Sequence, residues 1–127
     1  MSYTKKNLND VADAAVGGGF SETQEARFAG KDLDAEDTGV SYHVVRAGKR
    51  QAFGHRHEAA EEVYVVLSGS GRVKLDDDII DLETMDAIRV APKVARQFEA
   101  GPDDLEVLAF GPQHEGDGEL LREFWTD

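Results

Sequence analysis

The chain has 127 residues, the length of one domain, and can bury roughly two-thirds of its unfolded surface in a single core. Its 14 Lys and Arg against 26 Asp and Glu give a net charge of −12, which disfavours nucleic acid and anionic membranes as partners. The absence of cysteine excludes disulfides and thiolate chemistry. Because the sequence shows neither a signal-peptide pattern nor an apolar run of about 20 residues, we expect a soluble, cytoplasmic protein.

Residues 1–39 are predicted to form an arm that contains one short helix. An apolar stripe at helical spacing is made by Leu8, Val11, Ala12 and Ala15. Asn7 is a suitable N-cap for this helix, and Gly17 is suited to end it. Residues 23–28, TQEARF, are predicted to form an arm strand, and the acidic segment KDLDAEDTG is predicted to be an exposed loop.

From Val40 onward, short β-rich runs alternate with turn signals. We expect strands near 40–46, 51–57, 61–67, 71–75, 79–82, 85–90, 95–99 and 105–110. This rhythm is typical of an all-β sandwich or barrel and not of alternating strand–helix units. The run of three aspartates that begins at Asp76 is predicted to form the tip of a hairpin. We expect residues 1–127 to be a single domain with a barrel core at about 40–110.

The second and third predicted strands carry the side chains best suited to metal binding. His55 and His57 are two residues apart, so in an extended chain both imidazoles lie on one face, about 7 Å apart along the strand. In the next β-rich run, the same period of two places Glu62 and Tyr64 on one face. Two imidazoles and a carboxylate are the ligand set of a metal site with open positions. The same spacing is equally consistent with solvated polar surface.

This segment resembles the first motif of the cupin superfamily, in which a Gly precedes His-x-His, a Glu follows after four residues, and a second Gly follows after six more. The matching residues are Gly48, His55, His57, Glu62 and Gly69, with one extra residue before the first His. The resemblance covers roughly residues 40–110. It implies a double-stranded β-helix, or jelly-roll barrel, with a metal ion near the floor of a bowl-shaped pocket.

The second cupin motif corresponds to the run DAIRVAPKVARQF and matches less well. Pro92 agrees with the motif, whereas Asp86 and Val94 stand where glycines are usual. Gln97 stands where the family has its fourth metal ligand, a His. The resemblance therefore implies a site that departs from the family pattern at one ligand.

The matching positions imply one divalent metal ion held by His55, His57 and Glu62, with Gln97 as a candidate fourth ligand through its amide oxygen. Two nitrogens and a carboxylate suit Fe(II), Mn(II), Ni(II), Co(II) or Zn(II), and the sequence does not choose among them. Tyr64 is the candidate catalytic residue, in contact with substrate or relaying a proton. A purely structural place in the pocket wall is an equal alternative for it.

Two classes of function are consistent with this resemblance. The first is a metal-dependent enzyme, of oxygenase, isomerase or lyase type, that acts on a small oxygenated metabolite. The second is a non-catalytic module that binds or senses a small molecule. The sequence leaves both open and does not identify the ligand.

Two further histidines and the C-terminal tail complete the candidate features. His43 lies on the strand before the motif and faces either the pocket or the opposite side, while His114 lies in a Gly-rich loop that is predicted to be solvated. Residues 111–127 are predicted to contain a helical turn that docks on the barrel or on a partner subunit. The residues at helical spacing are Leu121, Phe124 and Trp125. The arm, the tail and the uncovered strand face of Val63, Val65 and Leu67 predict a homodimer with a twofold axis.

Overall fold

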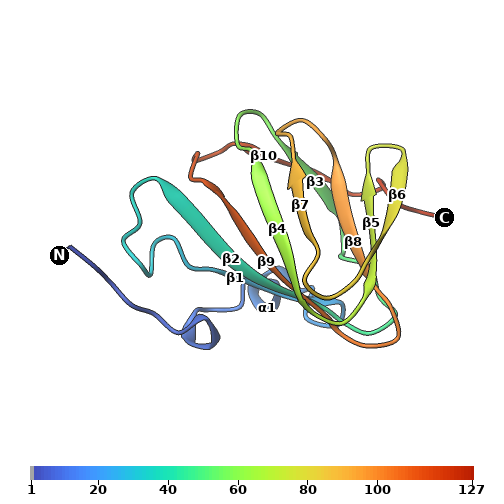
Figure 1. Ribbon diagram of the computed structural model, residues 1–127, viewed down its shortest axis with the longest axis horizontal. Coiled ribbons are helices and arrows are strands. Elements are labelled where there is room, and N and C mark those ends of the chain that lie inside the picture. Colours follow the sequence, from blue (N-terminus) through green and yellow to red (C-terminus); the bar gives the residue numbers. More distant parts are fainter. Residues whose placement is uncertain (1) are drawn as a thin grey trace.

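The computed structural model describes residues 2–127 as two antiparallel five-stranded sheets that pack face to face. The first sheet has the strand order β1–β2–β9–β4–β7, and the second has the order β10–β3–β8–β5–β6 (Figure 1). The strands are β1 (Gln24–Phe28), β2 (Thr38–Val45), β3 (Gly54–His57), β4 (Glu62–Ser68), β5 (Gly71–Leu75), β6 (Asp78–Leu82), β7 (Ala87–Val90), β8 (Arg96–Ala100), β9 (Leu105–Pro112) and β10 (Gly118–Leu121). The predicted all-β barrel is therefore confirmed, with the arm strand at β1.

The core fills the space between the two sheets, because period-two alternation turns one face of each strand inward. Its buried members are Val45, Tyr64, Val66, Val73, Leu82, Val90, Phe98, Ala100, Leu105, Val107 and Ala109. Gly69 ends β4 with a φ of +80°, and a Cβ atom there would lie 2.2 Å from the Asp104 carbonyl oxygen. This position therefore requires glycine, which accounts for the last residue of the first motif.

The predicted N-terminal helix is present but divided. A 3₁₀ turn covers Leu8–Asp10, and the helix α1 covers only Ala14–Gly18. Val11 between them is extended and buried, and its carbonyl oxygen accepts a hydrogen bond from the Arg27 guanidinium. Asp13 bridges to the backbone of β1 and caps α1 with its carboxylate. Pairing with β1 thus holds residues 11–13 extended and prevents one continuous helix.

The predicted C-terminal helical turn is not found in the described chain. Residues 118–121 form strand β10, which pairs with β3, and a turn follows at 122–123. Trp125 docks on the barrel, where it is 5% exposed and the Arg50 guanidinium lies 4.2 Å from its ring centroid. The available edge of β3 accounts for the difference, because backbone pairing there satisfies hydrogen bonds that a short isolated helix leaves open.

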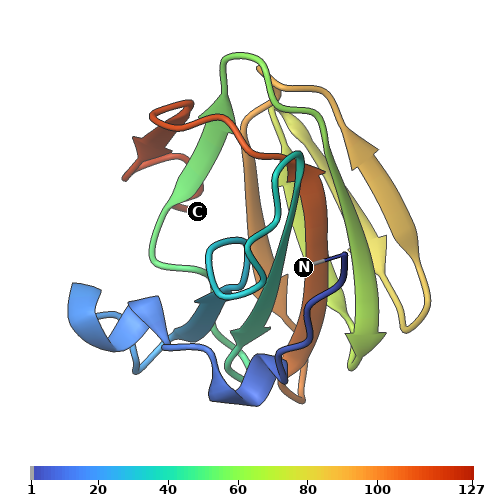
Figure 2. The same ribbon diagram turned by 90° about the vertical axis from the view of Figure 1, so that its left-hand side faces the viewer.

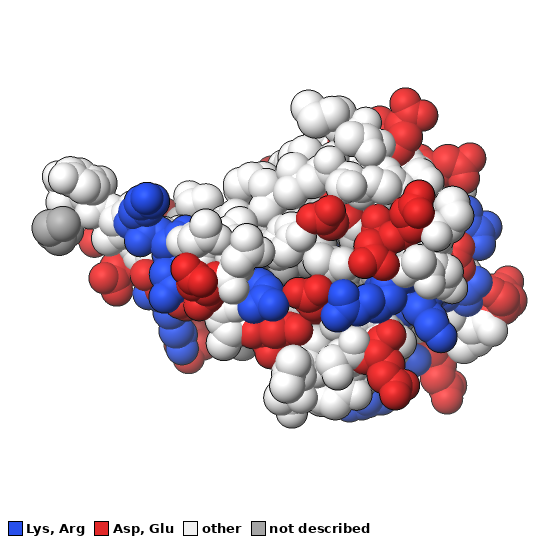
Figure 3. All heavy atoms as spheres, turned by 90° about the horizontal axis from the view of Figure 1, so that it is seen from below, with Lys and Arg blue, Asp and Glu red and all other residues white. Residues whose placement is uncertain are grey.

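Charged side chains pair across the surface despite the excess of acidic groups. Glu99 accepts from both Arg50 and Arg72, each with a closest N–O distance of 2.7 Å. On the face shown in Figure 3, basic side chains lie in a band with acidic side chains on both sides. Within residues 2–127, no helix is long and apolar enough to span a membrane.

Candidate metal centre

The first two candidate ligands share one face of β3. His55 and His57 alternate with exposed Arg56, and their rings meet edge to face with centroids 5.2 Å apart. β3 is held between β8 and β10, with His55 opposite Arg96 and His57 opposite Gly118. The strand geometry predicted from the His-x-His spacing is therefore present.

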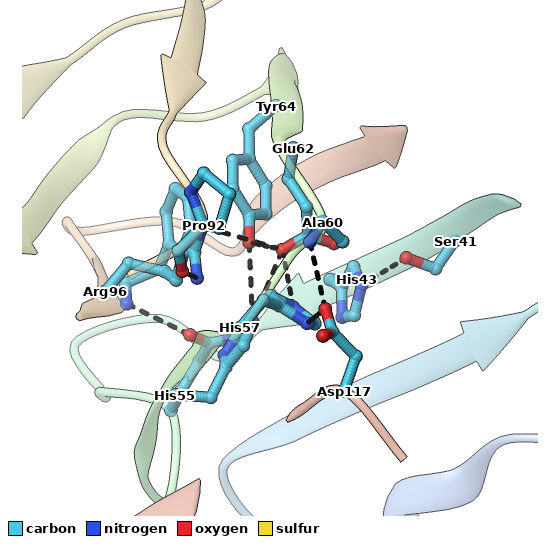
Figure 4. Close-up of polar contacts among 12 residues, drawn as sticks. Ser41, His43, His55, His57, Ala60, Glu62, Tyr64, Pro92, Arg96 and Asp117 are labelled. Carbon is cyan, nitrogen blue, oxygen red and sulfur yellow. Dashed lines mark hydrogen bonds and ion pairs between the residues drawn. The ribbon is translucent and has the colours of Figure 1, made fainter. Parts of the chain in front are cut away.

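Glu62 begins β4 in the other sheet and reaches across to both imidazoles. Its Oε1 atom lies 3.4 Å from His55 Nε2 and 3.1 Å from His57 Nε2 (Figure 4). One ligand atom from each of the three residues lies within 4.8 Å of the others. The structure thus brings together the three residues that the first motif singled out.

The electrostatics of this group favour the forms that bind metals. Burial by itself raises the pKa of Glu62, but its polar neighbours His55, His57 and Tyr64 lower it, and the net pKa lies well below the usual value. Burial lowers the pKa of His55, although Glu62 opposes the shift. A carboxylate and a neutral imidazole are the protonation states that coordinate a cation.

The donors also fit the geometry of one shared ion. Two ligands at about 2.1 Å from a metal lie about 3.0–3.4 Å apart in octahedral or tetrahedral arrangements. The two distances from Glu62 to the imidazoles, 3.1 and 3.4 Å, match this range. Neither ring nitrogen of His57 makes a hydrogen bond of good geometry within residues 2–127, although both are buried and lie 3.1 and 3.3 Å from the carboxylates of Glu62 and Asp117. A buried nitrogen left without a partner beside a carboxylate is suited to a metal ion.

Tyr64 lies on the inward face of β4 with Glu62, as the sequence predicted. Its hydroxyl donates a hydrogen bond of 2.6 Å to Glu62 Oε1 and lies 3.5 Å from His55 Nε2. Burial raises the pKa of Tyr64 well above its usual value, and the negative charge of Glu62 adds to the effect. The phenol is therefore a hydrogen-bond donor at neutral pH.

Gln97 does not reach the metal group. Its amide nitrogen donates to the Gln51 carbonyl oxygen at 2.7 Å, and its position on β8 alternates with the inward-facing residues Arg96 and Phe98. Arg96, fully buried, takes the inward place opposite His55, and its Nη2 atom lies 4.0 Å from Glu62 Oε1. The expectation that Gln97 points toward the two histidines is therefore wrong by one residue of register.

Asp117 is a site residue that the sequence analysis missed. Its carboxylate accepts hydrogen bonds from the backbone N–H groups of Ala59 and Ala60, at 2.9 and 3.0 Å, and lies 3.3 Å from His57 Nδ1. It thus ties the loop between β3 and β4 to the segment before β10 (Figure 4). The Gly-rich run around it was the available signal, but the histidine of that run, His114, is exposed.

The metal group lies in the wall of a cavity of about 350 Å³ between the sheets. His43 lines this cavity, so of the two orientations left open for it the structure has the inward one. The α1 segment lines one side of the cavity and β10 lines another. Figure 2 shows these two segments on opposite sides of the open edge of the barrel.

Comparison with known proteins agrees with the fold. Residues 42–111 match the family described as "Cupin domain", which is more than half of the chain. The chain belongs to the cupin family. An uncharacterised protein from Methanocaldococcus jannaschii is 31% identical over 70 residues, a match that covers 53% of this chain and 56% of that protein.

Solved structures share the barrel at low sequence identity. A cupin protein from Bacteroides fragilis superposes with a TM-score of 0.72 and 24% identity, over 100% of this chain and 98% of that one. The polyketide cyclase RemF from Streptomyces resistomycificus gives 0.74 and 18%, over 97% and 87% of the two chains. An oxalate decarboxylase from Bacillus subtilis gives 0.77 and 15%, over 91% of this chain and 31% of that one. At these identities the likeness concerns the fold.

Proposed function

We propose that the protein holds one divalent metal ion through His55, His57 and Glu62 and uses it on a small oxygenated metabolite. The observation that carries this proposal is the convergence of three donor atoms, from two sheets, at a cavity wall. Fe(II), Mn(II), Ni(II), Co(II) and Zn(II) all suit two nitrogens and a carboxylate. When bound, such an ion acts as a Lewis acid toward a carbonyl, enolate or carboxylate oxygen, in chemistry of oxygenase, isomerase or lyase type.

Tyr64 is the proposed hydrogen-bond donor to the substrate in this site. Its hydroxyl proton points to Glu62 Oε1, beside the place where a ligand oxygen would meet the metal group. A phenol with a raised pKa stays protonated, so it can donate a hydrogen bond to a substrate oxygen that gains negative charge. It acts on the substrate and does not hold the metal.

Arg96 determines the charge that the ligand should carry. Its buried guanidinium lies 4.0 Å from Glu62 and balances the single negative charge of the metal group. A bound dication would then be balanced only in part, by the Asp117 carboxylate behind His57. This favours a ligand whose oxygen head is anionic, such as a carboxylate or an enolate.

The alternative is a non-catalytic module that binds or senses a small molecule. The observation that favours it is the mainly apolar lining of the cavity away from the metal group. Both alternatives use the same metal group and the same cavity. They differ in whether a bound ligand is converted.

We also propose that two copies of the chain form a homodimer through the outer face of the first sheet. The outer patch consists of Val40, Val63, Val65, Leu108 and Phe110, which adjoin one another across β2, β9 and β4. Each of these side chains is half-buried or exposed, and Phe110 is 36% exposed. A contiguous apolar sheet face of this kind is suited to a self-complementary contact.

Calorimetric titration of metal-free protein with Zn²⁺ and Mn²⁺ tests the metal site. Wild type should bind one equivalent, and His57→Ala and Glu62→Gln should each weaken binding at least 100-fold. His114→Ala removes an exposed histidine outside the cavity and should bind like wild type, which controls for adventitious binding. Tyr64→Phe removes a hydrogen bond to Glu62 and should weaken binding less than the loss of a ligand does. Binding that survives Glu62→Gln unchanged would refute the proposed site.

A further inference from the structure

The cavity extends well beyond the metal group, and its walls are aromatic. Four phenylalanine rings line it, namely Phe20, Phe28, Phe53 and Phe98. Phe20 and Phe53 meet edge to face with centroids 5.2 Å apart, and Tyr64 lies 4.9 Å from Phe98. The volume of about 350 Å³ lies at the small end of the range for ligand pockets, about 300–1,000 Å³. Such walls favour a small flat aromatic body, because ring edges and faces pack at these distances.

A second polar pair lies on the wall formed by β2. Ser41 and His43 both line the cavity, and Ser41 Oγ lies 2.7 Å from His43 Nε2. Phe28 packs edge to face against the imidazole, with centroids 5.5 Å apart. The contact with Ser41 uses Nε2, which leaves Nδ1 as the second polar atom of the ring. A ligand that reaches this wall can therefore form a hydrogen bond with the imidazole.

The register of the sheet places this pair two strands away from Tyr64. Ser41 pairs with Ala109 on β9, and Ala109 pairs in turn with Tyr64 on β4. Ser41 and Tyr64 are therefore two strand spacings apart, or about 10 Å between their backbones. The residue between them has only a methyl side chain, which leaves room for a ligand above it. Figure 4 shows the Ser41–His43 pair to one side of the His55–Glu62–Tyr64 group.

We propose that Ser41 and His43 form a second polar contact for the ligand, which is an aromatic compound with an anionic oxygen head at one end and a hydrogen-bonding group at the other. The head lies at Glu62 and Tyr64, the ring body lies over Ala109, and the far group bonds to His43. This inference rests on the proposed function for the head group only. The second contact and the aromatic body follow from the cavity itself.

Two matched probes test this arrangement. The first is a hydroxynaphthoic acid whose hydroxyl and carboxylate are adjacent on one ring, and the second carries one more hydroxyl on the far ring. Their dissociation constants are measured by titration calorimetry on zinc-loaded protein. Wild type should prefer the second probe by several-fold to about tenfold, the effect of one additional hydrogen bond. In His43→Leu and Ser41→Ala, the ratio of the two dissociation constants should fall toward one.

Further variants separate this inference from the metal proposal. Ala109→Leu fills the space between the two polar ends and should weaken the binding of both probes at least tenfold. His114→Leu should change neither affinity. Glu62→Gln should weaken the binding of both probes and leave the ratio of their dissociation constants unchanged. Loss of the preference in His43→Leu together with an unchanged affinity in Glu62→Gln would support the second contact and refute the metal-bound head.

Three results would overturn the second contact. The first is equal binding of the two probes by wild type. The second is a preference that persists in both His43→Leu and Ser41→Ala. The third is failure of wild type to bind either probe while zinc still binds, because this would exclude the aromatic body and leave the metal site standing.

Discussion

At the scale of single residues, the neighbourhood of Glu62 determines the properties of the site. Its carboxylate receives a hydrogen bond from Tyr64, faces two imidazoles and lies 4.0 Å from the Arg96 guanidinium. A cation in the place of a fourth ligand should weaken metal binding by repulsion and leave that coordination position to water or to a ligand. Residue 96 is therefore expected to control metal affinity, and residue 97 is not.

Arg96→His should tighten Zn²⁺ binding about 10- to 100-fold, because it removes a positive charge and supplies an imidazole on the inward face. Arg96→Met, which removes the charge and adds no nitrogen, should give a smaller gain. Gln97→His should leave the affinity unchanged, since residue 97 lies on the other face of β8. Calorimetric titration measures all three. A gain in Gln97→His without one in Arg96→His would show that the register of β8 is different.

His43 should make stability depend on pH. Burial lowers its pKa from the ordinary 6.5 to about 4 in the folded state, so the unfolded chain takes up the proton first as pH falls. The contribution is therefore fully present above pH 6.5 and is lost as pH falls from 6.5 toward 4, by on the order of 3 kcal/mol. Urea unfolding at a series of pH values should show a shallower decline for His43→Gln than for wild type. Parallel declines in the two proteins would contradict this.

At the scale of secondary structure elements, prediction succeeded where the side-chain pattern alone determines the face. The alternation in β3 and β4 correctly placed His55, His57 and Glu62 together. It failed at β8, because a shift of one residue in a strand moves every side chain to the opposite face, and the degenerate motif supplied no glycine to fix the register. It also failed at the tail, where the edge of β3 recruits β10 by long-range pairing that local spacing does not encode.

The segment before β10 positions the metal group from the loop side. The Asp117 carboxylate anchors the backbone of Ala59 and Ala60 and lies 3.3 Å from His57 Nδ1, so it can orient the ring that presents Nε2 to Glu62. Asp117→Ala should weaken Zn²⁺ binding about 10- to 100-fold, an effect typical of groups that orient a metal ligand. Glu119→Ala removes a neighbouring exposed carboxylate and should have little effect on Zn²⁺ affinity. Equal affinities for Asp117→Ala and wild type would exclude the orienting role.

At the scale of the whole molecule, the first sheet has two different faces. Its inner face carries the cavity, and its outer face carries the patch of Val40, Val63, Val65, Leu108 and Phe110. The sequence identified Val63 and Val65 of this patch, because they alternate with Leu67 along one strand, although Leu67 itself is not part of the patch. It did not identify the contributions of β2 and β9, since cross-strand neighbours depend on the sheet order.

Light scattering at tens of micromolar protein should give twice the chain mass of 13.9 kDa. Phe110→Glu places a charge in the outer patch and should give the monomer mass, because an unpaired charge is costly in an apolar contact. Ile79→Glu, at a similarly exposed position on β6 of the other sheet, should remain dimeric. A monomer mass for wild type would contradict the proposed assembly.

The central claim is that the His55–His57–Glu62 group binds a metal ion in the folded protein. The most direct test is thermal unfolding at pH 8 of protein purified without an affinity tag, first stripped with chelator and then supplied with a first-row divalent ion. A ligand that binds only the folded state, present at 100 times its dissociation constant, adds about 2.7 kcal/mol, which should raise Tm by roughly 10 °C. Glu62→Gln should lose this increase. Identical melting curves of wild type with and without each of the five candidate ions would contradict the account.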